Sequence, residues 1–556
     1  MIYLTGLHLT KRMKNSLLLF GFVVLCFSNV FAQNLNWVKQ VGTWSNDFYS
    51  RVSSDNQGNI FISGCIYDDT LSIDGNILIG PNSTSSLFVV KCDSSTNNIV
   101  WAVFYPTTSG GKIDDLCIDR QGNCILTGVF YDQMVIGNDT LSDPTFDPTS
   151  FLISINAGGT LNWYNHLSST CELNAKKVTT DDIGNIYTCG RLYCNGQFDT
   201  ISINTIGYEN FYIAKFSNSG NVLWVKNGTG KRMLTLDYSS AGVIRACTQY
   251  FDSLSIDNVT IYSNSPYENS AIVELDTSGY LGLVKNLSHS ISVSSSVNIT
   301  GLSTDAMDNV FISGSFDSAV VFIDSTLSSY QDNDIFILKL YNDGFSYSLK
   351  RFGGVHNDLS YSMVTDDVGV SYLCGSFEGA ISFDGSWYFT AGSKGAFVCR
   401  VDSALNAEWV LNSDNNLYTE AFDLSLTRDN KLILTGTMNG PLDWGSWNLN
   451  TFGLEDIWIA SISDISMGES LTSINNAEKL QIFPVPASDK ISIYGLPEAT
   501  GIIEISDLHG KIIYSSIKPI YFKEIELNLI FRPGFYLVHY IDHSNTKMRI
   551  GKLIVE

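Results

Sequence analysis

Cationic side chains are scarce in this sequence of 556 residues. It contains 33 Lys and Arg against 56 Asp and Glu, which gives a formal charge of -23, and only 16% of its residues are charged. A chain this acidic repels the phosphates of nucleic acids and the anionic faces of membranes. We therefore expect no nucleic-acid partner and interpret the acidic surface as a source of solubility. Calcium is the one cofactor that such a surface leaves open.

Motifs for catalysis and for metal binding are missing as well. The sequence has no Gly-x-Ser-x-Gly, no His-Glu-x-x-His and no phosphate-binding glycine loop, and its seven histidines are scattered. None of its 11 cysteines forms a Cys-x-x-Cys pair, so no metal site is indicated. Cys189 and Cys194 are the closest mature pair for a disulfide. Whether the protein is an enzyme is uncertain, and the missing motifs count against it.

Long apolar runs are confined to the N-terminus. Basic residues precede an apolar run at residues 17–27, and Val30-Phe31-Ala32 follows as a small-residue cleavage pattern. Residues 1–32 are therefore predicted to be a secretory signal peptide. No later segment approaches 18 apolar residues, so we expect no transmembrane segment in the mature chain. Met13 begins a more typical signal than Met1, and either can be the true start.

A phrase rich in turn-forming residues recurs along the chain. Its pattern is Asp-x-x-Gly-Asn, then alternating apolar residues and a closing Gly. Clear copies begin at Asp55, Asp119, Asp181 and Asp305, and degenerate copies lie at residues 240–247, 366–375 and 428–436. A spacing of roughly 60 residues indicates an array of seven β-rich units. We interpret the aspartates as turn formers, with Gly or Asn taking positive φ before a strand.

Each unit continues with a third and a fourth strand. The fourth is marked by Trp in four units, and one such strand, around Trp37, precedes the first unit. The seventh unit ends near Asp464 without a fourth strand. Ring closure accounts for both facts, because the Trp37 strand completes the last unit and protects its edge. We therefore predict an all-β fold, in which residues 33–464 form a seven-bladed β-propeller closed by the N-terminal strand.

The repeat also resembles a known family. In the phrase Asp-x-x-Gly-Asn-[Ile/Val]-[Phe/Tyr]-Ile-[Ser/Thr]-Gly and the later Phe-[Val/Ile]-x-Lys strand, the chain resembles seven-bladed β-propeller proteins with SBBP-type repeats. The resemblance covers about residues 34–464, although the fourth copy, at residues 240–247, departs from the pattern. It implies a propeller fold but no particular reaction.

A different pattern begins after a linker predicted at residues 465–477. Residues 478–556 contain strands separated by turn residues and predict a small C-terminal β-sandwich. The segment resembles the type A C-terminal sorting domain of the type IX secretion system of Bacteroidetes-type bacteria, although Val485 replaces the usual Asn. The residues that carry the resemblance are Pro484, Pro486, Ala487, Ser488, Asp489, Gly510, Lys511, Gly534 and Tyr536.

The resemblance implies that the type IX machinery is a partner of this chain. It also implies a secreted location or one at the outer-membrane surface. The sorting domain is then removed at the surface or linked to an anchor, and the sequence leaves both outcomes open.

Two sets of residues are candidates for ligand binding in the propeller. Asp47, Asp358 and Glu420 lie at or near the start of predicted inner strands, where carboxylates in the central channel can hold a cation or form an acid/base pair. Trp387, Trp444 and Trp447 lie between second and third strands and can stack on sugars or pack between strands.

A further pattern, Asp-[Ser/Thr]-apolar, follows most repeat phrases. It resembles the O-glycosylation sequon that Bacteroidetes use on exported proteins, and ordinary turn chemistry explains it almost equally well. The hydroxyl residues concerned are Thr70, Thr140, Thr200, Ser253, Ser318 and Ser403.

Two classes of function follow from this organisation. The first is a surface-displayed binding or adhesion scaffold that presents a propeller face to an extracellular glycan or protein. The alternative is an extracellular propeller enzyme, a lyase or hydrolase that acts on glycans. A pocket with convergent titratable groups would favour the enzyme, whereas a flat rim would favour binding.

Overall fold

The computed structural model describes residues 32–465, with gaps at 82, 84, 95–97, 144–146, 206–208, 264, 416 and 445–446, and the strands between residues 481 and 555. Residues Gln33–Asp464 form one compact unit, and the strands after residue 480 belong to another. All regular elements in these ranges are β-strands. The described part of the chain thus contains no helix long and apolar enough to cross a membrane. The predicted signal peptide and linker fall almost entirely outside it.

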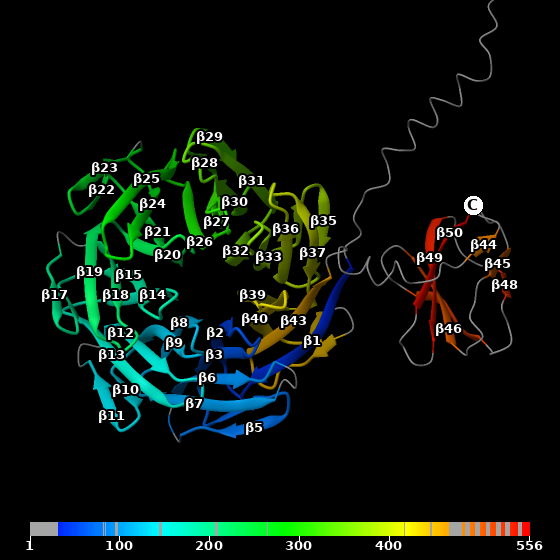
Figure 1. The fold of residues 1–556 in the computed structure, drawn as a ribbon, viewed down its shortest axis with the longest axis horizontal. Coiled ribbons are helices and arrows are strands. Elements are labelled where there is room, and N and C mark those ends of the chain that lie inside the picture. The colour runs from blue at the N-terminus through cyan, green and yellow to red at the C-terminus, as the bar shows by residue number, and fades with distance from the viewer. Residues whose placement is uncertain are drawn as a thin grey trace, which may run out of the picture. The chain divides into compact units, whose positions relative to one another are not determined.

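The first unit is a ring of seven blades (Figure 1). Its innermost strands surround the central channel, and each contacts the innermost strand of the next blade until β39 returns to β2. The predicted seven-bladed propeller is therefore confirmed. The innermost strands are β2 (Asp47–Ser54), β8 (Gly111–Ile118), β14 (Leu173–Thr180), β20 (Arg232–Tyr238), β26 (Ser296–Thr304), β32 (Asp358–Thr365) and β39 (Tyr418–Leu426).

Three further antiparallel strands follow outward in each blade. The second strands are β3 (Ile60–Ile66), β9 (Cys124–Phe130), β15 (Ile186–Leu192), β21 (Val243–Tyr250), β27 (Val310–Asp317), β33 (Ser371–Phe377) and β40 (Lys431–Asn439). The third strands are β6 (Ser85–Cys92), β12 (Thr149–Ile155), β18 (Asn210–Phe216), β24 (Asn269–Asp276), β30 (Asp334–Leu340), β36 (Gly395–Val401) and β43 (Asp456–Ile465). The fourth strands are β7 (Ile99–Thr107), β13 (Leu161–Ser169), β19 (Val222–Thr229), β25 (Leu281–Ser290), β31 (Tyr347–Gly354), β37 (Ala407–Asn412) and β1 (Ala32–Gly42).

A hairpin between the second and third strands of each blade crosses to the preceding blade. There it pairs with the fourth strand and extends that sheet to six strands; beside blade six it pairs with the short strand β38 (Asp414–Asn415) instead. Neighbouring blades are thus joined by backbone hydrogen bonds as well as by side-chain packing. The hairpins are β4 (Thr70–Ile73) with β5 (Asn76–Ile79), β10 (Gln133–Ile136) with β11 (Asp139–Ser142), β16 (Gly196–Phe198) with β17 (Ile201–Ile203), β22 (Ser253–Ile256) with β23 (Val259–Tyr262), β28 (Ala319–Phe322) with β29 (Ser325–Ser328), β34 (Ala380–Phe383) with β35 (Ser386–Phe389), and β41 (Leu442–Trp444) with β42 (Trp447–Leu449).

The ring closes as the sequence predicts. Strand β1, which carries Trp37, lies beside β43 in the last blade (Figure 1). Asn36 Nδ2 donates to Ser463 Oγ at 2.7 Å, and Gln40 Nε2 donates to Asp456 Oδ2 at 2.7 Å. These contacts join segments more than 400 residues apart, so the last blade is completed only when both ends of the propeller have been synthesised.

The repeated aspartates form turns, as predicted. Asp181 Oδ1 accepts the backbone N–H groups of Ile183 and Asn185 at 3.2 and 2.8 Å, and its Oδ2 accepts Asn185 Nδ2 at 2.8 Å. Gly184 between them has a φ of 85°. Asp55, Asp119 and Asp305 make the same bonds to their own turns.

The tryptophans of the fourth strands bind the next blade. Trp163 Nε1 donates to Asn218 O at 2.9 Å across the blade boundary, and its ring lies over Gly220 in the same turn. Trp101 and Trp224 reach Ala157 O and Thr277 O in the same way, over Gly159 and Gly279. In these three blades the Trp of the fourth strand is therefore a latch to the next blade, whereas the buried Nε1 of Trp409 has no hydrogen-bond partner among the described residues.

Replacing Gly220 by Ala is expected to destabilise the propeller by about 2–4 kcal/mol. Its φ of 85° strains any side chain, and a Cβ there would lie 2.6 Å from the Trp163 ring. Gly242→Ala is the matched control, because Gly242 has a φ of 80° but no atom within 4 Å of its Cβ position, so only about 1–2 kcal/mol should be lost. Urea unfolding of the two variants measures the difference, and equal losses would contradict the latch.

The disulfide differs from the pair expected from sequence proximity. Cys194 is bonded to Cys171, with Cα atoms 5.5 Å apart, whereas Cys189 is buried and free. The ladder between β14 and β15 explains the pairing, because Leu173 lies opposite Leu192 and the same register places residue 171 opposite residue 194. Cys189, Cys247 and Cys374, which share one repeat position, are fully buried, as expected of small core residues.

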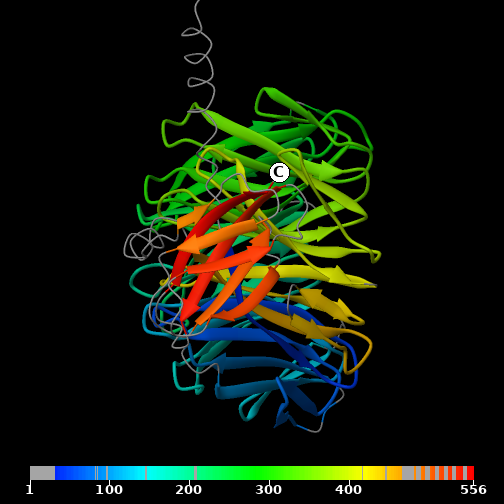
Figure 2. The same ribbon diagram turned by 90° about the vertical axis from the view of Figure 1, so that its right-hand side faces the viewer.

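The C-terminal unit contains two antiparallel sheets in its described residues (Figure 2, orange and red). One sheet has the order β44-β45-β48 and the other the order β47-β46-β49-β50. Packing of the two sheets as a sandwich remains a prediction. The strands are β44 (Gln481–Phe483), β45 (Lys490–Tyr494), β46 (Gly501–Asp507), β47 (Ile512–Lys518), β48 (Glu524–Asn528), β49 (Gly534–Asp542) and β50 (Met548–Val555).

Candidate functional site

A β-bulge interrupts each of the seven innermost strands at the same level of the channel. The register of the first and second strands shifts between Phe48/Arg51, Ile113/Asp115, Ala175/Lys177, Met233/Thr235, Ile299/Gly301, Ser360/Ser362 and Ala421/Asp423. A bulge adds one residue to a strand and redirects its side chain. The extra residues of six blades, together with Arg51 of the first, line a cavity in the channel.

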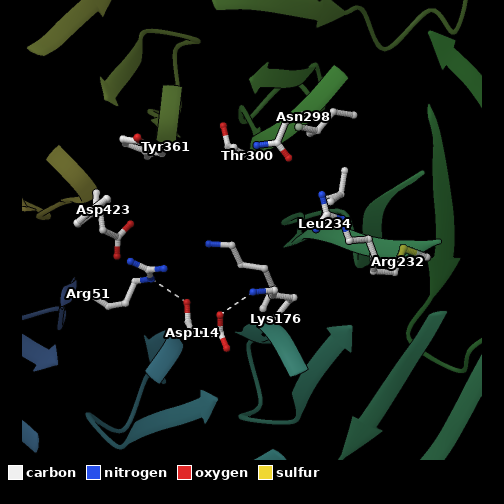
Figure 3. Close-up of a pocket in the computed structure, with 13 residues that line it drawn as sticks. Arg51, Asp114, Lys176, Arg232, Leu234, Asn298, Thr300, Tyr361 and Asp423 are labelled. Atoms are coloured by element: carbon white, nitrogen blue, oxygen red, sulfur yellow. Dashed lines mark hydrogen bonds and ion pairs between the residues drawn. The ribbon is translucent and has the colours of Figure 1, made fainter. Parts of the chain in front are cut away.

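This cavity has a volume of about 330 Å³, near the lower end of the range for small-molecule sites. Every blade contributes at least one side chain to it. Figure 3 shows the labelled side chains approaching the channel from strands on all sides. One part of the lining is charged, and the other is formed by Leu234, Ile299, Thr300, Tyr361 and Phe422. We call this cavity the channel site.

Two lysines share one carboxylate in the charged part. Lys112 Nζ and Lys176 Nζ each lie 2.8 Å from Asp114 Oδ1. Burial opposes ionisation of Asp114, but the two ammonium groups outweigh it and hold the pKa of this carboxyl below its usual value. Burial and the nearby Lys112 lower the pKa of Lys176. The second oxygen of Asp114, Oδ2, is buried and accepts no hydrogen bond within the described residues.

Two arginines complete the charged part with unused donors. Arg51 donates from Nε to Asp114 O at 2.7 Å and from Nη1 to Ser50 O at 2.9 Å. Arg232 donates from Nε to Gln249 Oε1 at 3.2 Å, and burial lowers its pKa. Arg51 Nη2 and both terminal nitrogens of Arg232 have no protein partner in the part of the chain that the structure describes.

The other two carboxylates in this part of the channel serve the contacts between blades. Asp115 Oδ2 accepts the backbone N–H of Val178 at 2.9 Å, and its Oδ1 lies 3.4 Å from Lys177 Nζ. Asp423 accepts Val52 N at 3.1 Å and Ser362 Oγ at 2.9 Å. Each oxygen of both carboxylates thus has a partner that holds it at a contact between blades.

The uncharged part of the site offers aromatic faces and one hydroxyl. The rings of Tyr361 and Phe422 lie 5.2 Å apart, and the Tyr361 hydroxyl donates to Glu420 Oε1 at 2.7 Å. Thr300 Oγ1 is buried and has no hydrogen-bond partner among the described residues. A ligand in this cavity would contact the rings of Tyr361 and Phe422 as well as the cationic groups of Arg51 and Lys176.

Of the three carboxylates proposed from sequence, only Glu420 contacts this site. It accepts hydrogen bonds from Tyr361 and Ser376 at Oε1 and from Tyr418 at Oε2, and it forms an ion pair with Lys394. Glu420 is 5% exposed. Four partners hold its carboxylate in place, so its geometry is that of a support for Tyr361.

Asp47 and Asp358 lie inside blade junctions, with no exposed surface. Thr43 N donates to Asp47 Oδ2 at 2.6 Å, and Gly354 N donates to Asp358 Oδ2 at 2.5 Å. Burial is the main cause that raises the pKa of each to about 8. The expected exposure of these two carboxylates to the channel is therefore incorrect, because the start of an inner strand packs against the preceding blade.

The three tryptophan candidates lie on outer hairpins, away from the channel. Trp444 is 2% exposed and packs edge-on against Trp458 at 4.7 Å. Trp447 is opposite it in the hairpin and is half-buried. Trp387 is 49% exposed on β35. Of the three, Trp387 is thus the one with a largely accessible ring.

Five residues of the proposed glycosylation pattern lie at or near outer hairpins of other blades, and Ser403 lies in the turn between β36 and β37. Thr140, Thr200 and Ser403 are exposed, and Thr70, Ser253 and Ser318 are half-buried. Seven of the nine residues of the sorting motif lie outside the described residues: Pro484, Pro486, Ala487, Ser488, Asp489, Gly510 and Lys511. Gly534 and Tyr536 lie in β49. No group of three or more His, Cys, Asp or Glu side chains suited to a metal ion occurs in the described ranges.

The channel site contains residues that sequence reasoning did not single out. Asp114, Lys176, Thr300 and Tyr361 each lie five residues before the aspartate that opens a repeat phrase. At this position the residue type changes from unit to unit, while the position two residues later is always apolar. A column of variable, often polar residues in a buried strand was the available signal for a bulge that faces a channel.

The C-terminal residues 481–556 match the family model described as a secretion system C-terminal sorting domain. A WD repeat-containing protein of Acanthamoeba polyphaga mimivirus is 23% identical over 515 residues, and the match covers 74% of this chain and 37% of that protein. The chain therefore spans well under half the length of this relative.

Solved structures resemble the chain only remotely. A protein of unknown function from Dyadobacter fermentans is 9% identical, with a TM-score of 0.36, and the match covers 78% of this chain and 99% of that one. PorZ, a surface component of the type IX secretion system of Porphyromonas gingivalis, is 12% identical, with a TM-score of 0.13 and coverage of 92% and 93%. The class of this protein follows instead from its own ring of blades and from the family match at residues 481–556. Together they make this chain a seven-bladed β-propeller with a type IX secretion C-terminal sorting domain, secreted or displayed at the cell surface.

Proposed function

We propose that this protein is an extracellular binding protein, an adhesion scaffold whose ligand occupies the channel site. The observation that carries the proposal is the mixed lining of one cavity, with unused cationic donors on one side and aromatic rings on the other. Sites for small molecules and sugar units combine a few directed polar groups with apolar walls. The partner is an extracellular glycan or protein that reaches the propeller after export.

The carboxylates of the channel favour binding over catalysis. A glycan hydrolase or lyase needs an acid and a base that face the substrate with free oxygens. Asp115 and Asp423 are committed to backbone and side-chain donors, and two lysines hold Asp114 ionised at Oδ1. Of these three carboxylates, Asp114 alone has an oxygen without a donor among the described residues, so they do not form the pair of free carboxyl groups that a glycan hydrolase uses.

We also assign the repeat to the SBBP type, on the strength of its recurrent phrase.

An array of extracellular glycans and matrix proteins, probed with the purified full chain, tests the proposal. Phe422→Ala should weaken binding to the ligands identified by about tenfold, because it removes one aromatic wall of the site. Trp387→Ala is the control, since it removes an exposed ring on an outer hairpin. Loss of binding in Trp387→Ala alone would move the ligand to that hairpin. Cleavage of a glycan without stable binding would support the enzyme instead.

A further inference from the structure

The channel site concentrates positive charge in a strongly acidic chain. Lys112, Lys176, Arg51 and Arg232 lie at or beside it, and among them Asp114 is the one carboxylate that forms ion pairs, with the two lysines. With Lys177, Asp115 and Asp423 included, five cationic groups stand against three carboxylates, so a surplus of positive charge remains. Beside Lys176, the guanidinium of Arg51 keeps Nη2 without a protein partner among the described residues. A carboxylate or sulfate is the complement of a guanidinium and an ammonium group that lie together.

Two buried atoms of the site have unused hydrogen-bonding capacity. Asp114 Oδ2 can only accept hydrogen bonds and has no donor among the described residues, and Thr300 Oγ1 has no partner of either kind there. Leaving such buried atoms unpaired is unfavourable. A fully ionised inorganic anion has no hydrogen to give to Asp114. A ligand that carries hydroxyl groups as well as the anionic group can satisfy both atoms.

The aromatic pair identifies the remaining part of the ligand. The rings of Tyr361 and Phe422 line the cavity, and the bond from the Tyr361 hydroxyl to Glu420 keeps its ring in place. Aromatic faces pack against the apolar C–H surface of a sugar ring, while the hydroxyls of the sugar point outward to polar groups. The cationic groups, the unpaired polar atoms and the aromatic rings of the lining thus correspond to the anionic group, the hydroxyls and the apolar ring surface of one sugar.

We propose that the channel site binds an acidic saccharide unit, whose carboxylate or sulfate lies against Arg51 and Lys176, the two cations that meet at Asp114 (Figure 3). A hydroxyl of the sugar donates to Asp114 Oδ2, another pairs with Thr300, and the ring packs against Tyr361 and Phe422. This rests on the binding function proposed above and specifies its ligand. Uronic acids and sulfated sugars share this chemistry, and they differ in the shape of the anionic group.

Three sugars that differ only at one carbon test the proposal by calorimetry on the purified full chain. Galacturonic acid carries a carboxylate there, galactose 6-sulfate a sulfate, and galactose a neutral hydroxyl. We expect at least one acidic sugar to bind about tenfold or more tightly than galactose, and its binding to weaken as salt increases. The acidic sugar that binds more tightly identifies the natural anion.

Variants locate the site and separate the outcomes. Arg51→Gln and Lys176→Gln should each weaken the acidic sugar about tenfold more than they weaken galactose. Lys226→Gln is the matched control, because Lys226 forms an ion pair with Asp257 on the outer part of a blade. Thermal unfolding confirms that each variant is folded. Equal affinity for galactose, or an equal loss in Lys226→Gln, would overturn the acidic ligand while the binding function stands. An array without any bound ligand would remove the binding function itself.

Discussion

A chain that ends at Asn476 is expected to remain in the periplasm. It keeps the predicted signal peptide, so it still crosses the inner membrane, but it lacks residues 481–556, which match the secretion sorting domain. The propeller should fold without them, since its ring is closed by β1 and β43 and residues Gln33–Asp464 form a compact unit of their own. Cell fractionation and antibody labelling of intact cells measure the result.

The full chain with Arg232→Gln serves as the control for export. This substitution lies in the propeller and should leave surface location unchanged. Thermal unfolding of the truncated protein from the periplasm would show that its retention is not caused by misfolding. Efficient labelling of the truncated chain on intact cells would refute the role of the C-terminal unit in sorting.

Raising the pH through the neutral range is expected to remove stability that the buried carboxyls Asp47 and Asp358 provide. Burial raises the pKa of both to about 8, from 3.8 in an exposed carboxyl, and Asp334 beside Asp358 is raised to about 6. Between these values the folded state retains protons that the unfolded state has released. For each proton retained in this way, the free energy of unfolding falls by about 1.4 kcal/mol for every unit by which the pH rises. The contribution is complete below about pH 4 and is lost as the pH rises towards about 8.

Asp358→Asn isolates this effect, because an amide has the shape of the protonated carboxyl and does not titrate. The stability of this variant relative to the native chain should rise by about 1.4 kcal/mol per pH unit between about pH 5 and 7, measured by urea unfolding. Asp308→Asn is the control, because the pKa of Asp308 is shifted in the opposite direction. Hydrogen bonds from Arg245 lower the pKa of Asp308, so its contribution is already complete above about pH 4 and the difference should stay constant over the same range. A constant difference for Asp358→Asn would contradict the neutral carboxyl.

The fold was largely predictable from local chemistry. The turn at Asp181-Asp-Ile-Gly-Asn is satisfied within five residues, and its repetition sets the number of blades without knowledge of any distant contact. The unmatched strand at Trp37 likewise required closure on the last blade. The crossing of each hairpin to the preceding blade was not predictable, because the pairing of Val41 with Ile73 is a contact between units and leaves no periodic signal in either strand.

The candidate site was predictable only in part. Glu420 was identified from the sequence as a carboxylate that holds a cation or forms an acid/base pair. Its four partners instead make it a support for Tyr361. Asp47 and Asp358 were expected in the channel and lie in the junctions between blades. A carboxylate at the start of an inner strand can face either place, and the choice depends on how the preceding blade packs against it.

The amino-acid sequence alone determined that this is an exported repeat protein of seven β-rich units with a sorting segment at its C-terminus. Those properties are written in short motifs, each satisfied by residues close to it in the chain. Only the tertiary structure decided where a ligand can bind. The channel site combines one to three residues from each of seven blades, and it exists because seven bulges, each without a strong local signature, come to one level when the ring closes.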